Sequence, residues 1–240
     1  ITGGFTNTFQ VTVSGLNAIS AAKLLYSTNT GSSFTEVTLN GVDTWSFTIP
    51  DGIYLANGIK IIAIDAIENE STTVFNPVPV VVDTTPPTVS SFTISDAALK
   101  IDDTATVTLQ FSEAVTNFSS NADITAQNGT LTEMTSTNGE ITWTGIFTPT
   151  ANVEDASNEL TLSTNYTDLA GNSGPSATAT PAYAIDTKAP VINVSNVVSN
   201  INDGLTALGS VSANEPVVWS ISAGTGVSIS STGVLTLNTV

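Results

Sequence analysis

The chain has 240 residues, of which 21 are acidic and four are basic, giving a formal net charge of −17, and it contains neither cysteine nor histidine. So few basic residues exclude the counterion release by which proteins bind nucleic acid, and they disfavour anionic membrane surfaces. Among small ligands, cations are therefore expected to bind this acidic chain. The absence of cysteine excludes disulfides and thiolate chemistry, and no run of about 18 apolar residues predicts direct membrane insertion.

Strand patterns recur along the chain. Apolar residues alternate with polar ones at Phe9, Val11 and Val13, at Trp45, Phe47 and Ile49, and at Val107, Leu109 and Phe111. This period of two is typical of half-buried antiparallel strands. Four Asn-Gly pairs supply residues suited to tight hairpins, at 40–41, 57–58, 128–129 and 138–139. The sequence therefore predicts an all-β fold of sandwich type, with about seven short strands in each module.

An internal repeat divides the chain. Three pairs of residues are each 103 positions apart: Asp65 and Asp168, Asn69 and Asn172, and Asp83 and Asp186. Glu113 in FSEAV follows Asp83 by 30 residues, and Glu215 in ANEPV follows Asp186 by 29. Several matches in a common register indicate tandem modules at 1–83, 84–186 and 187–240, arranged as an elongated array.

The two end modules are predicted to be incomplete. In the first, a strand at 8–14 comes so early that no room is expected for the strand before it. The third stops 54 residues after Asp186, roughly half a repeat. Two explanations stay open: the chain is part of a longer array, or neighbouring chains complete its half-modules by strand addition.

The repeated motifs predict a metal site at the first junction. In an immunoglobulin-like sandwich the loops carrying Glu113, Asp168 and Asn172 return to the end where the chain enters, so they should meet Asp83 in the linker DTTPP. Prolines keep that linker extended and stiff. Three carboxylates and an amide oxygen would repel one another without a cation, and such hard oxygen ligands suit Ca²⁺.

The same geometry predicts further acidic groups elsewhere in the array. A second junction would gather Asp186 and Glu215, with Glu154 and Asp155 contributing from the other side. In the first module, Asp65 and Asn69 would face a preceding module. Calcium at such sites would chiefly stiffen the array, because motion between domains is otherwise the default.

Simpler interpretations exist for the same residues. Asp83 can be a turn residue that caps backbone amides, and Asp168 with Asn172 can be a loop held by its own hydrogen bonds. The three tryptophans lie in alternating segments, which favours core packing over a sugar-binding platform. Without histidine or cysteine the usual general base and two common nucleophile arrangements are missing, so no enzymatic activity is expected.

The segments DTTPP, FSEAV and YTDLAGNSG resemble the tandem immunoglobulin-like repeats of giant secreted bacterial adhesins, whose modules open with Asp-Thr-Thr-x-Pro and close near Asp-x-x-Gly-Asn. The third module, with NEPVVWSIS, is also similar to bacterial cadherin-like repeats. The resemblance implies an extracellular stalk at the cell surface, with calcium held at the junctions by Asp83, Asp168, Asn172 and Asp186. The first module departs from the pattern, because Glu68 stands where the family usually has glycine, and the tight turn there is an open question.

The expected function is thus a structural segment of a bacterial surface adhesin involved in biofilms, whose partners are neighbouring modules of the same polypeptide and possible like chains. One alternative is a self-assembling subunit of a surface layer or filament. Another is a carbohydrate-binding module of a secreted enzyme, which an exposed row of aromatic side chains would support. A third treats the acidity as adaptation to salt.

Overall fold

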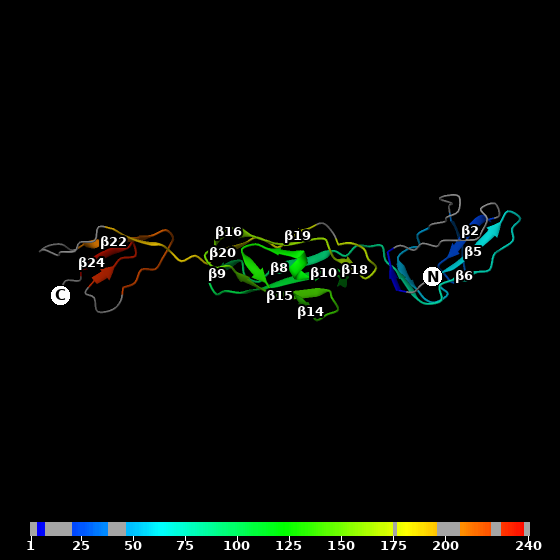
Figure 1. Cartoon of the computed structure of the whole chain (residues 1–240), viewed down its shortest axis with the longest axis horizontal. Coiled ribbons are helices and arrows are strands. Elements are labelled where there is room, and N and C mark those ends of the chain that lie inside the picture. The colour runs from blue at the N-terminus through cyan, green and yellow to red at the C-terminus, as the bar shows by residue number, and fades with distance from the viewer. Residues whose placement is uncertain are drawn as a thin grey trace.

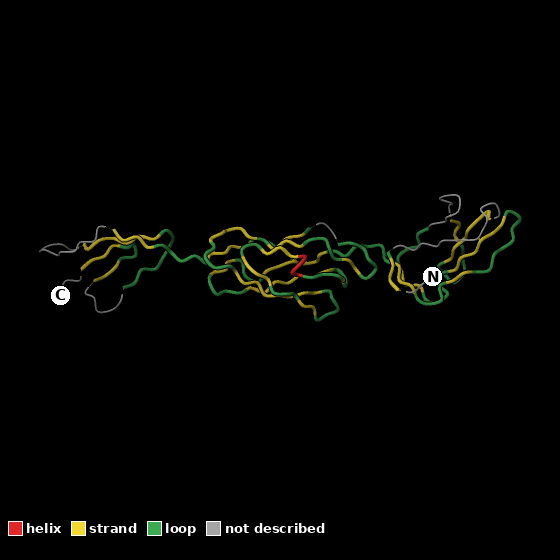
Figure 2. The backbone as a smooth tube through the Cα atoms, in the orientation of Figure 1, coloured by secondary structure: helices red, strands yellow, loops and turns green. Residues whose placement is uncertain are grey.

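A computed structural model of the chain describes residues 4–7, 21–37, 47–174, 177–195, 207–221 and 227–237. Strands dominate these residues, and the sole helix among them has four residues (Figure 2). The strands form three groups that lie in a row along the longest axis of the molecule (Figure 1). The predicted all-β class and the elongated array are therefore confirmed. No helix in the described ranges is long and apolar enough to cross a membrane.

The first unit has two small sheets, ordered β1-β7-β4 and β3-β2-β5-β6. Its buried core includes Leu24, Ile61 and Val80. The strands are β1 (Gly4–Thr6), β2 (Ala21–Ser27), β3 (Thr35–Val37), β4 (Gly52–Tyr54), β5 (Lys60–Asp65), β6 (Val74–Phe75) and β7 (Val80–Val82).

The middle unit is described almost completely. Its largest sheet has the order β13-β15-β10-β8 with β14 beside β15, and further sheets are β11-β18, β12-β17-β19 and β16-β20-β9. The elements are β8 (Val89–Ile94), β9 (Ala98–Lys100), β10 (Ala105–Phe111), β11 (Val115–Thr116), α1 (Ser120–Asp123), β12 (Ile124–Ala126), β13 (Gly129–Leu131), β14 (Thr135–Ser136), β15 (Thr142–Pro149), β16 (Glu154–Asn158), β17 (Leu160–Leu162), β18 (Thr167–Asp168), β19 (Thr178–Ala179) and β20 (Tyr183–Asp186).

The core of the middle unit lies between the β10 sheet and the sheets that contain β17 and β20. Val107, Leu109 and Phe111 of β10 are at most 1% exposed, as their alternation predicts. Leu160 of β17 and Ile185 of β20 belong to the same buried cluster. Burial of these side chains from two layers is what holds the unit together, since each fully buried side chain contributes roughly 1.5–3 kcal/mol.

The third unit is a single sheet ordered β21-β22-β24-β23, with β21 (Ile192–Ser195), β22 (Ala207–Ala213), β23 (Val227–Ile229) and β24 (Val234–Leu237). This order matches β8-β10-β15-β13 of the middle unit strand by strand. Ile192 and Val194, which pair with Ala213 and Val211, are more than half exposed. The described residues of this unit include no second sheet to cover that apolar face.

The strands predicted in the first unit are in part outside the described residues and in part absent. The segment 8–14 and Trp45 lie outside the described residues, as does the Asn-Gly pair at 40–41. Residues 47–50 form no strand, so that prediction is wrong there. Ile49 is nevertheless buried, and the following Pro50 lacks the N–H that a ladder needs.

A strand does precede residue 8 in the first unit, contrary to the expectation that none had room. β1 pairs in parallel with β7, as β9 pairs in parallel with β20 in the middle unit. A counterpart of β8 is not among the described residues of the first unit. The first module is therefore predicted to be incomplete only in that it lacks a counterpart of β8.

Turn and strand details follow the sequence in part. Asn57, Asn128 and Gly139 have positive φ angles of 62°, 51° and 75°, which confirms three of the predicted Asn-Gly turns. The described part of the middle unit has 13 short strands rather than about seven. The pairing register also shifts within β10, between Gln110 and Phe111, and within β16, between Asp155 and Asn158.

Trp143 packs inward rather than forming a sugar platform. Its ring lies edge-on to Phe118, with ring centroids 4.9 Å apart, and its Nε1 donates a hydrogen bond to the Glu140 carbonyl. It also packs against the buried cluster of the middle unit.

Two buried tyrosines are expected to make the middle unit less stable at alkaline pH. Burial raises the pKa of Tyr166 and of Tyr183 to about 12, and the charge of Asp123 adds to the effect at Tyr166. Unfolded tyrosine ionises near pH ~10, so the folded state holds its protons more tightly and stability is lost as pH rises above that value. We expect the free energy of unfolding to fall by about 1.4 kcal/mol per pH unit for each tyrosine between roughly pH 10 and 12.

Urea unfolding between pH 9 and 11.5, approximate limits set by those pKa values, measures this slope. Tyr183→Phe should reduce it, and near neutral pH the variant should be at least as stable as the native chain, because the Tyr183 Oη has no hydrogen-bond partner in the structure. An unchanged slope in that variant would contradict the assignment.

Candidate metal centre at the first junction

The linker between β7 and β8 begins at Asp83. The Asp83 N–H donates to the Thr6 carbonyl at 3.0 Å, and its Oδ1 accepts a hydrogen bond from the Thr85 N–H at 3.0 Å. One carboxylate oxygen thus caps the linker backbone, which is the simpler role considered for this residue. A carboxylate offers two oxygens, so this cap is compatible with a second role for the Asp83 side chain as a metal ligand.

The turn after β18 presents Asp168 and Asn172 to this linker. Asp168 Oδ1 accepts from the Asn172 N–H at 2.9 Å, and its Oδ2 accepts from Asn172 Nδ2 at 2.7 Å. Asn172 Nδ2 also donates to the Asp83 carbonyl at 2.8 Å. Both side chains are at least nine-tenths buried. Asn172 therefore fixes the linker to the middle unit as a hydrogen-bond donor, and its predicted role as a metal ligand stays a prediction.

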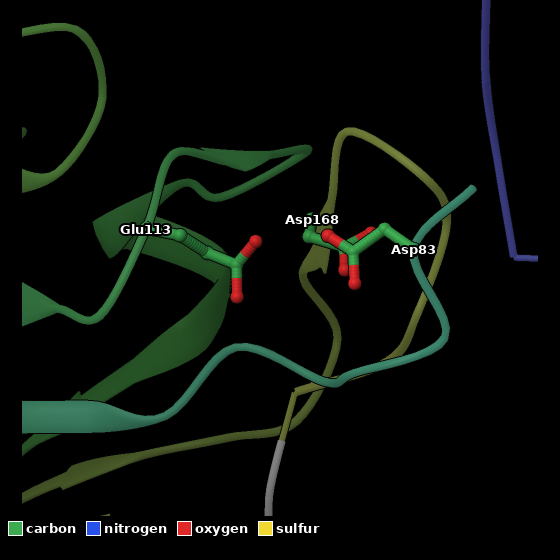
Figure 3. A group of neighbouring side chains, drawn as sticks. All are labelled: Asp83, Glu113 and Asp168. Carbon is green, nitrogen blue, oxygen red and sulfur yellow. The ribbon is translucent and has the colours of Figure 1, made fainter. Parts of the chain in front are cut away.

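Glu113 completes a cluster of carboxylates. It lies between β10 and β11, and one oxygen from each of Asp83, Glu113 and Asp168 lies within 4.8 Å of the other two (Figure 3). The two ion pairs found among the described residues involve none of the three. Burial, followed by the negative charges of Asp83 and Asp168, raises the pKa of Glu113.

The electrostatics of the cluster indicate what it can bind. A raised pKa means that Glu113 takes up its negative charge at a cost, and a cation between the three groups would remove that cost. Oxygen donors of this kind fit Ca²⁺, which takes six to eight oxygens and accepts backbone carbonyls and water as the remainder.

The second junction is arranged differently. Among the described residues, only the first junction holds three acidic groups within the stated distance, so Asp186, Glu215 and Glu154 are not gathered in the same way. Lys188 Nζ lies 3.1 Å from Glu154 Oε2. Burial, then the charges of Asp186 and Glu154, raises the pKa of Glu215, and Lys188 opposes this shift. A lysine thus supplies positive charge here.

Asp155 faces the interior of the middle unit. It accepts hydrogen bonds from Asn128 Nδ2 at 2.9 Å and from the Ser157 N–H at 3.0 Å. Its carboxylate therefore holds together segments of one unit.

The first unit repeats the turn of the middle unit. Asp65 Oδ1 accepts from the Asn69 N–H and Oδ2 accepts from Asn69 Nδ2, both at 2.8 Å. These hydrogen bonds lower the pKa of Asp65. Glu68 adopts a φ of 70°, close to the 93° of Gly171, so the tight turn forms without glycine. Asp65 belongs to no cluster of three acidic side chains among the described residues.

Sequence reasoning missed one residue at the first junction. Asp51 accepts hydrogen bonds from the Thr84 N–H at 3.0 Å, from Thr84 Oγ1 at 2.9 Å and from Thr85 Oγ1 at 3.1 Å. Its distance of 103 residues from Glu154 is the signal that could have found it.

Comparison with known proteins covers part of the chain. Residues 83–185 match the model of a bacterial Ig-like domain. No curated protein matches the sequence. Among solved structures, the extracellular domain of protocadherin GammaB4 aligns with 98% of this chain at 12% identity and a TM-score of 0.37, and the chain spans 42% of that protein's length. The middle unit is therefore similar to bacterial Ig-like domains from its entry linker to its last strand.

Replacing Asn172 tests how much the linker depends on this turn. Asn172→Ala should lower the free energy of unfolding of the middle unit by about 1–3 kcal/mol, because buried Asp168 and the Asp83 carbonyl lose a donor. Asn69→Ala is the matched control, since Asn69 makes the same bonds to Asp65 on an exposed turn without a linker. Hydrogen exchange of the β10 amides reports the stability of the middle unit, and that of the β5 amides reports the stability of the first unit. Equal effects of the two substitutions would contradict this role.

Proposed function

We propose that the chain is a non-enzymatic extender segment of a bacterial cell-surface adhesin, and that calcium stiffens its first junction. The convergence of Asp83, Glu113 and Asp168 on the linker is the observation that carries the proposal, and neither ion pair found in the described ranges involves these three acids. The similarity of 83–185 to bacterial Ig-like domains and the row of units support a spacing role outside the cell.

Calcium would act by joining the linker to the middle unit. Asp83 belongs to the linker, whereas Glu113 lies in a loop and Asp168 at the end of β18 of the middle unit, so an ion held by all three would restrain rotation about the linker. When bound, the ion would supply charge neutralisation. The protein would supply the three carboxylate oxygens, and Asn172 would hold the Asp168 carboxylate and the Asp83 main-chain carbonyl in place by hydrogen bonds.

The energetic effect is modest for folding and large for a hinge. With an extracellular-type Kd of ~10⁻⁴ to 10⁻³ M and free calcium of ~1–10 mM, binding stabilises the unit by about 0.4–2.7 kcal/mol. Contacts between domains are otherwise small, so this range can decide whether adjacent units move freely.

The third unit favours a second candidate, a subunit that assembles with like chains. Its sheet exposes Ile192 and Val194, and Val218, in the segment 216–221, is 97% exposed. That segment belongs to none of the described strands. Residues 187–240 carry only Lys188, Asp203 and Glu215 as charged residues, so charge repulsion between copies would be weak there.

Thermal unfolding with calcium and with excess chelator tests the calcium site. Calcium should raise the midpoint of the middle unit, and Glu113→Gln should remove most of that increase while preserving the shape of the site. Glu159→Gln, which removes an exposed carboxylate elsewhere in the same unit, should respond to calcium as the native chain does. An identical calcium response in both variants would refute the proposed site.

Size measurement separates the two candidate functions. A monomer at all accessible concentrations supports the extender role, whereas concentration-dependent dimers or polymers support assembly. In the second case Val194→Asp should abolish association by placing a charge on the apolar face. Ser195→Asp, on the opposite face of the same strand, should leave association intact.

A further inference from the structure

The linker at the first junction is also fastened to the unit before it. Both carboxylate oxygens of Asp51 take part: Oδ1 accepts from the N–H and Oγ1 of Thr84, and Oδ2 accepts from Thr85 Oγ1. Bonds to a carboxylate are stronger and shorter than bonds between neutral groups. Asp51 therefore holds two consecutive linker residues from the side of the first unit.

The sheet register explains why Asp51 reaches this position. It immediately precedes β4, whose first residue Gly52 pairs with Val82 at the end of β7. One step further along this antiparallel ladder, Asp51 lies opposite Asp83. The chain therefore leaves the first unit directly beside the Asp51 carboxylate.

The middle unit has an acidic residue in the same place. Glu154 begins β16 and pairs in register with Asp186 of β20. Glu154 follows Asp51 by 103 residues, the offset that also relates Lys188 to Thr85. Lys188 Nζ lies 3.1 Å from Glu154 Oε2, so the acid again contacts the third residue of the linker.

The second residue of each linker is held as well. At the second junction Thr187, the counterpart of Thr84, donates from Oγ1 to the Thr150 carbonyl at 2.7 Å and accepts from the Val153 N–H at 2.9 Å. Both linkers are thus attached to the unit before them, but by different contacts. At the first junction, linker hydroxyl and N–H groups donate to Asp51. At the second junction, Thr187 bonds to the backbone of the middle unit and Lys188 forms an ion pair with Glu154.

We propose that Asp51 and Glu154 are positioning residues that latch each linker to the unit before it without a metal ion. The latch is distinct from the carboxylate cluster. Asp51 is not among the three clustered acids, and it belongs to the first unit, whereas Glu113 and Asp168 belong to the middle unit. In this arrangement the latch fixes where the linker leaves one unit, and Asn172 with the cluster fixes how it enters the next. The latch does not depend on the proposed calcium site.

Spin-label distance measurements test the first latch. The chain has no cysteine, so cysteines introduced at the exposed residues Ser32 and Ala156 can carry the labels. In excess chelator, Asp51→Ala should widen the distance distribution roughly twofold, because motion between domains is the default once a linker is released. Asp51→Asn, which keeps an acceptor for Thr84, should restore part of the native width.

The control and the calcium arm separate this proposal from the previous one. Glu70→Ala removes an exposed acid of the same unit and should leave the width unchanged, and thermal unfolding should show that all variants fold. Calcium should still narrow the distance distribution of the Asp51→Ala variant. The Glu113→Gln variant should show the native width in chelator, but calcium should not narrow its distribution. If the Asp51→Ala variant has the native distance distribution in chelator, the proposed attachment by Asp51 is refuted, whether or not calcium narrows the distribution.

Salt tests the second latch. Lys188 and Glu154 are both about half exposed, with side-chain exposures of 47% and 52%, so their ion pair should be screened by salt. Labels at Ala156 and Ser220 should show a wider distribution at ~1 M sodium chloride, where the Debye length is about 3 Å. Lys188→Met should produce that width at low salt and remove the dependence on salt. If salt leaves the native distribution unchanged, or if Lys188→Met remains salt-sensitive, the ion-pair latch is refuted.

Discussion

Repulsion among three carboxylates is the constraint on which the first junction depends. Asp83, Glu113 and Asp168 come from the linker and two separate loops, yet an oxygen of each lies within 4.8 Å of the others. Burial first, and then the neighbouring charges of Asp83 and Asp168, raise the pKa of Glu113. The fold can hold them together because the buried Asn172 hydrogen bonds satisfy Asp168 and because two layers of apolar side chains fix the loops. This geometry is the basis on which we propose that the cluster binds a divalent cation.

The linker gains its rigidity from contacts on both sides. Asp51 holds Thr84 and Thr85 to the first unit, while Asn172 binds the Asp83 carbonyl from the middle unit. At its far end, the Thr88 N–H donates to Ser112 Oγ, and the second junction repeats this with Val191 and Asn214. The prolines limit the remaining torsional freedom. A short segment attached in this way transmits orientation between units, which is the property that an extender requires.

Much of this could be predicted because the sequence repeats. The common offset of 103 residues relates Asp168 to Asp65 and Asp186 to Asp83, which marks these acids as repeated features, and sandwich geometry then brings the Asp168 turn and the Glu113 loop to the end where Asp83 enters. Asp51 was missed because its 103-residue distance from Glu154 does not by itself reveal a contact with the linker, which becomes evident only from the strand register. The donor role of Asn172 was missed because sequence does not specify which way a side-chain amide points. The second junction could not be predicted from its acids alone, since the effect of Lys188 depends on the register that places Glu154 beside it.

A calcium titration followed by carbon-13 NMR of the side-chain carboxyl groups tests the central claim most directly. If one ion binds the cluster, the carboxyl carbons of Asp83, Glu113 and Asp168 should shift together along one saturating curve, while those of Asp51 and Asp155 shift little. Small shifts spread over all acidic residues, without saturation, would mean that calcium only screens the surface charge and that the first junction holds no specific ion.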